Sequence, residues 1–107
     1  MRRYGSVIGL RPEGEARYRE LHAAVWPAVL DRLSASHIRN YSIFERDGML
    51  FSYFEYVGDD FDGDMAAIAA DPVTQEWWTH TDPLQEKVPT AAPDEHWAPM
   101  EEVFHVD

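Results

Sequence analysis

The sequence predicts a ferredoxin-like α+β fold, in which a four-stranded antiparallel sheet carries helices on one face. Short runs rich in β-branched and aromatic residues alternate with helical segments in the order strand, helix, strand, strand, helix, strand. The two middle strands are joined by Arg46-Asp47-Gly48, a combination typical of a tight hairpin turn. This βαββαβ order is that of ferredoxin-like domains. The 107 residues fit a single domain spanning residues 1–107, with no internal repeat.

The first third of the chain predicts a strand followed by a broken helix. Residues 3–10 are rich in Val, Ile and Tyr and end before Pro12, as a strand would. A helical pattern then runs from Pro12 to about Ser36, with acidic residues in its first turn. Pro27 lies inside this pattern, where it removes a backbone donor and disfavours helical geometry at Trp26. We therefore expect a kink or break at residues 25–27.

The remaining elements follow from alternation and from helix-breaking residues. Residues 38–45 and 49–56 form the expected hairpin, with Tyr41 and Ile43 on one face of its first strand and Asn40, Ser42 and Phe44 on the other. A helix is expected over residues 61–70, and a short one from Asp71-Pro72 through Trp78. Residues 83–99 hold four prolines and predict a long loop, and residues 100–106 predict a final strand.

Charge and composition exclude several classes of partner. Nine basic and twenty acidic residues give a formal net charge of -11, which opposes binding to nucleic acid or to an anionic membrane surface. The absence of cysteine excludes disulfides and thiolate chemistry. The basic N-terminus lacks the apolar run of a signal peptide, so we expect a cytoplasmic protein. The five histidines show no helical pair at metal-ligand spacing, so no metal site is expected.

An uncovered sheet face predicts a homodimer. Helices on one side leave the other face of such a sheet open, and the strands here are rich in aromatic residues. A second copy of the chain is the simplest cover for that face.

Tyr18, His22 and Trp26 recur at intervals of four and would lie on nearly one face of a helix. Each carries an apolar ring with a polar group, a combination that resembles the wall of a sugar pocket. The alternative is that they are core residues whose polar groups found partners. Trp77-Trp78 raises the same question, because adjacent indoles on a short helix cannot both face one core. Either the second indole binds a ligand, or it lies at a dimer interface.

Five motifs, in their order and approximate spacing, resemble the L-rhamnose mutarotase family. They are Tyr18, His22 with Trp26-Pro27, Asn40-Tyr41, Trp77-Trp78 and the terminal Glu101-Glu102-Val103-Phe104-His105. The resemblance spans nearly the whole chain. It implies a dimeric, ferredoxin-like enzyme that interconverts the α and β anomers of a 6-deoxyhexose, a monosaccharide substrate, without cofactor or metal. It further implies that His22 is the proton donor and that the sugar is bound by Tyr18, Tyr41, Trp77 and Trp78.

Two departures from the family concern the substrate. Where rhamnose-type members carry His-Asn-Pro, this chain has His22-Ala23-Ala24. Residues 81–97 also differ, and a loop there could border the pocket. From the resemblance, L-rhamnose is the first expected substrate. Because of these two departures, L-fucose is kept as the second.

The chemistry requires a proton delivered to the ring oxygen and one removed from the anomeric hydroxyl. His22 suits the first task, since imidazole exchanges protons near neutrality. A phenol is a poor base at neutral pH, so both tyrosines are assigned to binding and orientation. The base stays open, with Glu101 or Glu102 as a possibility. Two other classes fit the same residues, namely a dimeric ferredoxin-like monooxygenase or haem-handling protein, and a non-enzymatic sugar-binding module.

Overall fold

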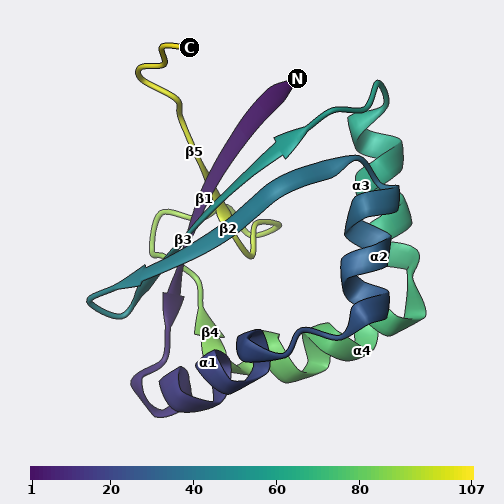
Figure 1. The fold of residues 1–107 in the computed structure, drawn as a ribbon. Helices are drawn as coiled ribbons and strands as arrows, with labels where there is room; N and C mark the ends of the chain where they lie inside the picture. Colours follow the sequence, from purple (N-terminus) through teal and green to yellow (C-terminus); the bar gives the residue numbers. More distant parts are fainter.

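The computed structural model describes residues 1–107 and contains one curled antiparallel sheet with helices beside one of its faces (Figure 1). Its long strands are β1 (Arg2–Leu10), β2 (Ile38–Arg46) and β3 (Met49–Tyr56), in the order β2-β3-β1-β4. The fourth position is shared by two short strands, β4 (Gln85–Glu86), which pairs with the end of β1 at Gly9 and Leu10, and β5 (Ala98–Met100), which pairs with its middle at residues 5–7. This arrangement confirms the ferredoxin-like fold.

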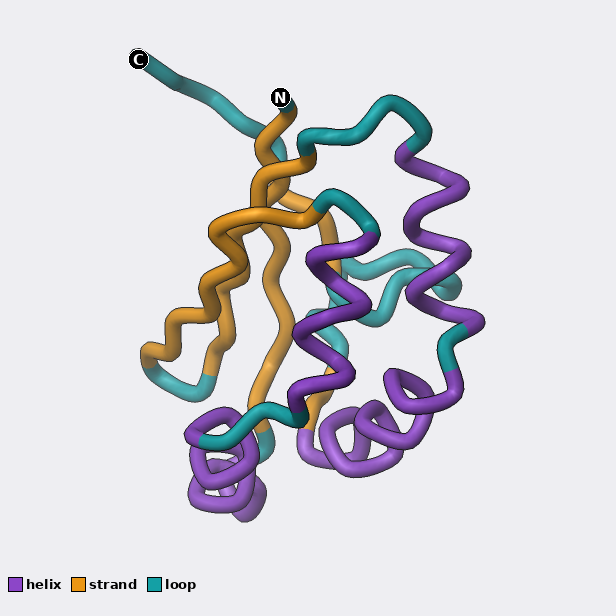
Figure 2. Tube along the Cα trace, turned by 45° about the vertical axis from the view of Figure 1, so that its right-hand side comes forward, coloured by secondary structure: helices purple, strands orange, loops and turns teal.

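The helices lie together on one side of the sheet, as Figure 2 shows. They are η1 (Pro12–Gly14), α1 (Glu15–Ala23), α2 (Pro27–Ala35), α3 (Phe61–Ala70), α4 (Pro72–Thr81) and η2 (Asp82–Leu84). The expected break is confirmed, because Trp26 has extended backbone angles (φ -60°, ψ 131°) and Pro27 begins a new helix. None of the helices is long and apolar enough to cross a membrane.

The predicted final strand over residues 100–106 is wrong. The strand is β5, which ends at Met100, and residues 101–107 form an exposed tail without regular structure. Met100 pairs with Gly5, so only three residues of β1 remain beyond that point for an antiparallel partner. The tail instead contacts β1 through its side chains, with Arg3 Nε 2.9 Å from Glu102 Oε1. A seven-residue strand needs a partner backbone of similar length, and the three residues left in β1 do not provide one.

The expected hairpin between β2 and β3 is present, with a two-residue turn because β2 extends through Arg46. Asp47 (φ 53°) and Gly48 (φ 73°) both adopt left-handed backbone, as a type I′ turn requires. A bulge interrupts the pairing between Arg39 and Ser42, and Asn40 lies within it at φ 50°. Because the bulge adds one residue, Ile38 and Tyr41 both face the helices although they are three positions apart.

The core lies between the sheet and the helices in three adjoining clusters. One joins Ile8, Leu10 and Leu50 of the sheet to Tyr18 of α1. A second forms among α1, α2 and α4, and the third joins β2 and β3 to α3 around Tyr56. The sheet therefore packs directly against α1 and α3, whereas α4 packs through Trp77 against α1 and α2.

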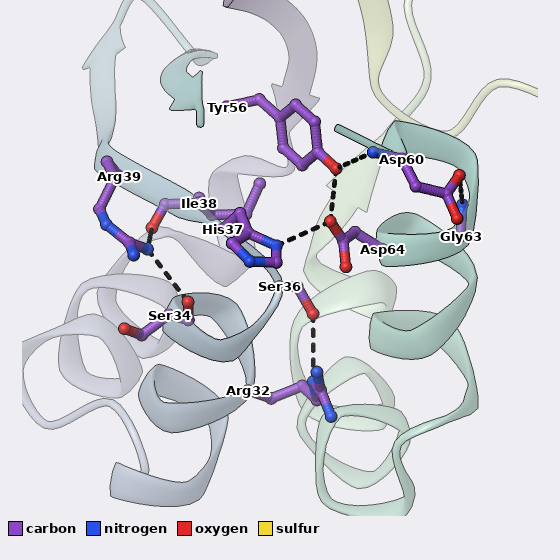
Figure 3. Close-up of polar contacts among 10 residues, drawn as sticks. All are labelled: Arg32, Ser34, Ser36, His37, Ile38, Arg39, Tyr56, Asp60, Gly63 and Asp64. Carbon is purple, nitrogen blue, oxygen red and sulfur yellow. Dashed lines mark hydrogen bonds and ion pairs between the residues drawn. The ribbon is translucent and has the colours of Figure 1, made fainter. Parts of the chain in front are cut away.

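A polar network fastens the start of α3 to the sheet (Figure 3). The Tyr56 hydroxyl donates to the Asp64 carboxylate and accepts from the Asp60 backbone N–H at 3.0 Å. His37 Nδ1 lies 2.9 Å from the same Asp64 oxygen, Oδ2. His37 has a left-handed backbone (φ 65°), which is strained for a residue with a side chain, so this contact helps to hold the turn before β2. Hydrogen bonds from Tyr56 and then His37 lower the pKa of Asp64.

Asp64→Asn is therefore expected to destabilise the fold at neutral pH, because the neutral amide accepts more weakly from the same two donors. Because folding lowers the pKa of Asp64, the ionised carboxylate stabilises the fold fully above pH 3.8, its ordinary pKa. This stabilisation is lost as the pH falls through the lowered pKa. The difference in unfolding free energy between wild type and variant should shrink below about pH 4. Urea denaturation across pH 2.5–7 measures it. Asp59→Asn, at an exposed position, is the matched control, and equal effects of both variants would contradict this account.

Candidate active site

The five side chains predicted to form the site line one cavity of about 660 Å³ between the sheet and the helices. Tyr18 and His22 come from α1, Tyr41 from β2, and Trp77 and Trp78 from α4. The cavity is lined mainly by apolar side chains, with a few polar groups among them. Such a composition is typical of a small-molecule site.

His22 is held by Tyr18 in two ways. The two rings stack with their centroids 4.2 Å apart and their planes 25° from parallel. His22 Nδ1 also lies 2.9 Å from the backbone carbonyl oxygen of Tyr18, one helical turn earlier. A carbonyl oxygen can only accept, so Nδ1 carries a hydrogen, and Nε2 is the nitrogen left for a ligand.

The four-residue spacing predicted that Trp26 shares a helix face with Tyr18 and His22. This prediction is wrong. The helix breaks before it, and Trp26 precedes α2 rather than ending α1. Its ring packs edge-on against Trp77, with centroids 5.1 Å apart, and Trp77 packs in the same way against His22 at 5.4 Å. Trp26 therefore supports the cavity wall from behind instead of lining it.

The two adjacent indoles have different surroundings. Trp77 is 6% exposed and packs against Leu21 and Val29, whereas Trp78 is 37% exposed. Both still line the cavity, because α4 runs along its edge. The start of α4 is fixed by Asp71, whose Oδ2 accepts from the Thr74 backbone N–H at 2.9 Å.

Both phenols in the cavity stay protonated at neutral pH. Burial raises the pKa of Tyr18 and of Tyr41 above the ordinary value of 10.0. The Tyr18 hydroxyl accepts a hydrogen bond from Gln85 Nε2 at 3.3 Å, which leaves its own hydrogen free to be donated. The two tyrosines are therefore hydrogen-bonding groups and not bases.

Beside Thr74 and Thr81, three further polar residues of the cavity have no role in the sequence analysis, namely Asp82, Gln85 and His96. Asp82, Gln85 and His96 belong to residues 81–97, where the chain departs from the family pattern and where a loop that could border the pocket was expected. Their contacts with one another depend on the path of the loop and have no signature in their spacing. Glu101 and Glu102, the carboxylates considered as a base, lie on the tail and do not line the cavity. No cluster of three or more His, Asp or Glu side chains is placed to hold a metal ion.

Comparison with known families gives a match over nearly the whole chain. The model of the L-rhamnose mutarotase family matches residues 3–106. The chain is 33% identical to an L-rhamnose mutarotase of Phocaeicola vulgatus, with 100% of both chains covered. It is 32% identical to an L-rhamnose mutarotase of Jannaschia sp., with 99% of both covered.

Solved structures show the same fold at lower sequence identity. An L-rhamnose mutarotase from Formosa agariphila matches 100% of both chains with a TM-score of 0.78 and 23% identity. The tetracenomycin F2 cyclase of Streptomyces glaucescens matches 100% of this chain and 98% of its own, with a TM-score of 0.72 and 13% identity. The second likeness shows that unrelated chemistry occurs on this fold, so the residues of the site decide the function.

Replacing each indole in turn should separate its structural from its ligand-facing role. Trp77→Ala removes a buried ring and is expected to lower the free energy of unfolding by about 3–5 kcal/mol. Trp78→Ala, at the more exposed position, should cost roughly 1 kcal/mol or less. Chemical denaturation of both variants measures the two values. Equal losses would show that the indoles do not divide the roles in this way.

Proposed function

The chain belongs to the L-rhamnose mutarotase family, and from this membership we propose that it interconverts the α and β anomers of L-rhamnose without a cofactor. The family match favours this reaction over a monooxygenase or haem-handling role and over simple sugar binding. It also favours L-rhamnose over L-fucose. The observation in the cavity that supports the proposal best is His22, whose Nδ1 is occupied by a backbone carbonyl while Nε2 remains for a ligand.

The cavity suits a deoxy sugar in shape and chemistry. Aromatic rings from α1, β2 and α4 offer flat apolar surfaces against which the C–H faces of a pyranose and its methyl group can pack. The Tyr18 and Tyr41 hydroxyls, both protonated, can hydrogen-bond to sugar hydroxyl groups. Trp78, partly exposed at the edge of the cavity, can cover one face of the ring.

His22 is assigned as the proton donor to the ring oxygen. When the imidazole is protonated, Nδ1–H remains bonded to the Tyr18 carbonyl and Nε2–H is the proton to be transferred. As the C1–O5 bond breaks, its electron pair stays on O5, which takes that proton. The O1–H pair becomes part of the C1=O1 bond, and its proton leaves to a base. Rotation about C1–C2 and reclosure, with both transfers reversed, then give the other anomer.

Anomer exchange of L-rhamnose should accelerate with the wild-type protein and lose about 10²- to 10⁴-fold of that acceleration in His22→Ala. Saturation-transfer NMR at the anomeric protons, run in parallel with L-fucose, measures both the rate and the preferred sugar. His105→Ala, on the tail outside the cavity, is the matched control. Exchange no faster than in buffer would reject the function, and full activity of His22→Ala would reject the donor.

We further propose that two copies of the chain pair through the sheet face turned away from the helices. Strand alternation places Val7 and Phe51 on this face, opposite to the buried Ile8 and Leu50. Phe44 pairs across the strands with Phe51, and the two are 63% and 37% exposed. Adjacent exposed aromatic rings on a sheet face favour a covering partner, and a second copy presents the complementary surface by symmetry.

Phe44→Glu should convert the proposed dimer to a monomer, because a carboxylate from each copy would be buried in the apolar interface. Analytical ultracentrifugation at micromolar concentration measures the mass in solution. Val73→Glu, which adds the same charge at an exposed apolar position on α4, should leave the dimer intact. A wild-type protein that sediments as a monomer would contradict the proposal.

The cytoplasmic location and the absence of nucleic-acid partners stay predictions. The formal net charge of -11 supports the second, since it repels phosphate backbones.

A further inference from the structure

A second imidazole lines the same cavity as His22 and has no role in the proposed reaction so far. It belongs to His96, in the loop between β4 and β5. His96 Nε2 lies 2.7 Å from Gln85 Oε1 and 3.5 Å from Asp82 Oδ1. Both neighbours also line the cavity. This polar group comes from the segment in which the chain departs from the family pattern.

These contacts determine which nitrogen of His96 can take a proton. The Asp82 carboxylate can only accept, and it faces the same nitrogen as the Gln85 carbonyl oxygen. Nε2 therefore carries the hydrogen, and the lone pair of the neutral ring is on Nδ1. An imidazole held in this way, with a carboxylate on its N–H side, accepts a proton at its other nitrogen.

Gln85 fixes His96 relative to the His22 side of the cavity. It is 6% exposed, and its backbone pairs with Leu10 of β1, so its position is set by the sheet. Its Oε1 contacts His96, while its Nε2 donates to the Tyr18 hydroxyl at 3.3 Å. Tyr18 in turn stacks on His22. One connected set of contacts therefore links the two imidazoles.

The other titratable groups of the cavity are weaker candidates for a base. They are Tyr18, His22, Tyr41 and Asp82. The two phenols stay protonated because burial raises the pKa of each. His22 is already assigned to the ring oxygen, and Asp82 faces the His96 N–H. His96 is the remaining imidazole of the cavity.

We propose that His96 is the catalytic base that takes the anomeric hydroxyl proton, with Gln85 and Asp82 as its positioning residues. This inference rests on the proposed mutarotase function. In the ring-opening step the O1–H proton moves to His96 Nδ1 while His22 gives its proton to O5, and the electron pair of the C1–O5 bond stays on O5. Ring closure returns both protons, so the two imidazoles end each turnover in their starting states.

His96→Gln and His96→Ala test this assignment through kcat and KM for L-rhamnose anomer exchange, obtained by saturation transfer over a range of sugar concentrations. Both variants should lose about 10²- to 10⁴-fold in kcat with little change in KM. The wild-type rate should fall on the acidic side as the base becomes protonated, and this fall should be absent in His96→Gln. Added imidazole should restore part of the activity of His96→Ala.

The outcomes separate the inference from the function on which it rests. Wild-type kcat in His96→Gln, or a change in KM alone, would overturn the role of His96 and would point to Asp82 as the base or to a mere binding contact. An inactive wild type would reject the mutarotase function itself. His105→Ala is again the matched control and should retain wild-type kcat and KM. Because removing the side chain in His96→Ala could alter the fold of the loop, the kinetics of His96→Gln are the decisive measurement. A thermal melt equal to that of wild type first establishes that His96→Gln is folded.

Discussion

The break in the helical segment at residues 24–26 is the constraint on which the rest of this structure depends. An uninterrupted helix from Pro12 to Ser36 would be about 37 Å long, close to the longest dimension of the molecule, 39 Å. Such a rod could not bend around a cavity. Because Pro27 starts a new helix, α1 lies across the end of the sheet beside α4, while α2 turns to run next to α3 (Figure 1). The cavity forms inside this corner.

A series of aromatic contacts connects the helix break to the active site. Trp26 packs on Trp77, Trp77 on His22, and His22 on Tyr18, with centroid distances between 4.2 and 5.4 Å. The imidazole is thus held between two rings, and its Nδ1 is tied to a backbone carbonyl. Residues that stabilise the corner also orient the acid, so rigid placement of the reactive nitrogen follows from the same packing that stabilises the fold.

Local signals in the sequence predicted most of the architecture. Pro27 indicated the helix break, Asp47-Gly48 the hairpin turn, and helical spacing with the family resemblance brought together the residues that line the cavity.

Features that depend on contacts between distant segments could not be predicted from the sequence. The bulge at Asn40 redirects Tyr41 through a register shift between two strands. The division of the edge position between β4 and β5 depends on where residues 87–97 leave the edge of β1 and return to it. The contact between His96 and Gln85 follows from the path of that loop. The alternating residues after Met100 predicted a strand, but the tail has too little of β1 left to pair with.

The central claim is that L-rhamnose binds against Nε2 of His22, the nitrogen left free by the Tyr18 carbonyl. Long-range ¹H–¹⁵N NMR of the histidine side chains, recorded with and without L-rhamnose, tests it most directly. The account predicts the Nδ1–H tautomer for neutral His22 and a shift of its Nε2 resonance on saturation with L-rhamnose. An Nε2–H tautomer, or an Nε2 resonance that does not respond to the bound sugar, would contradict it.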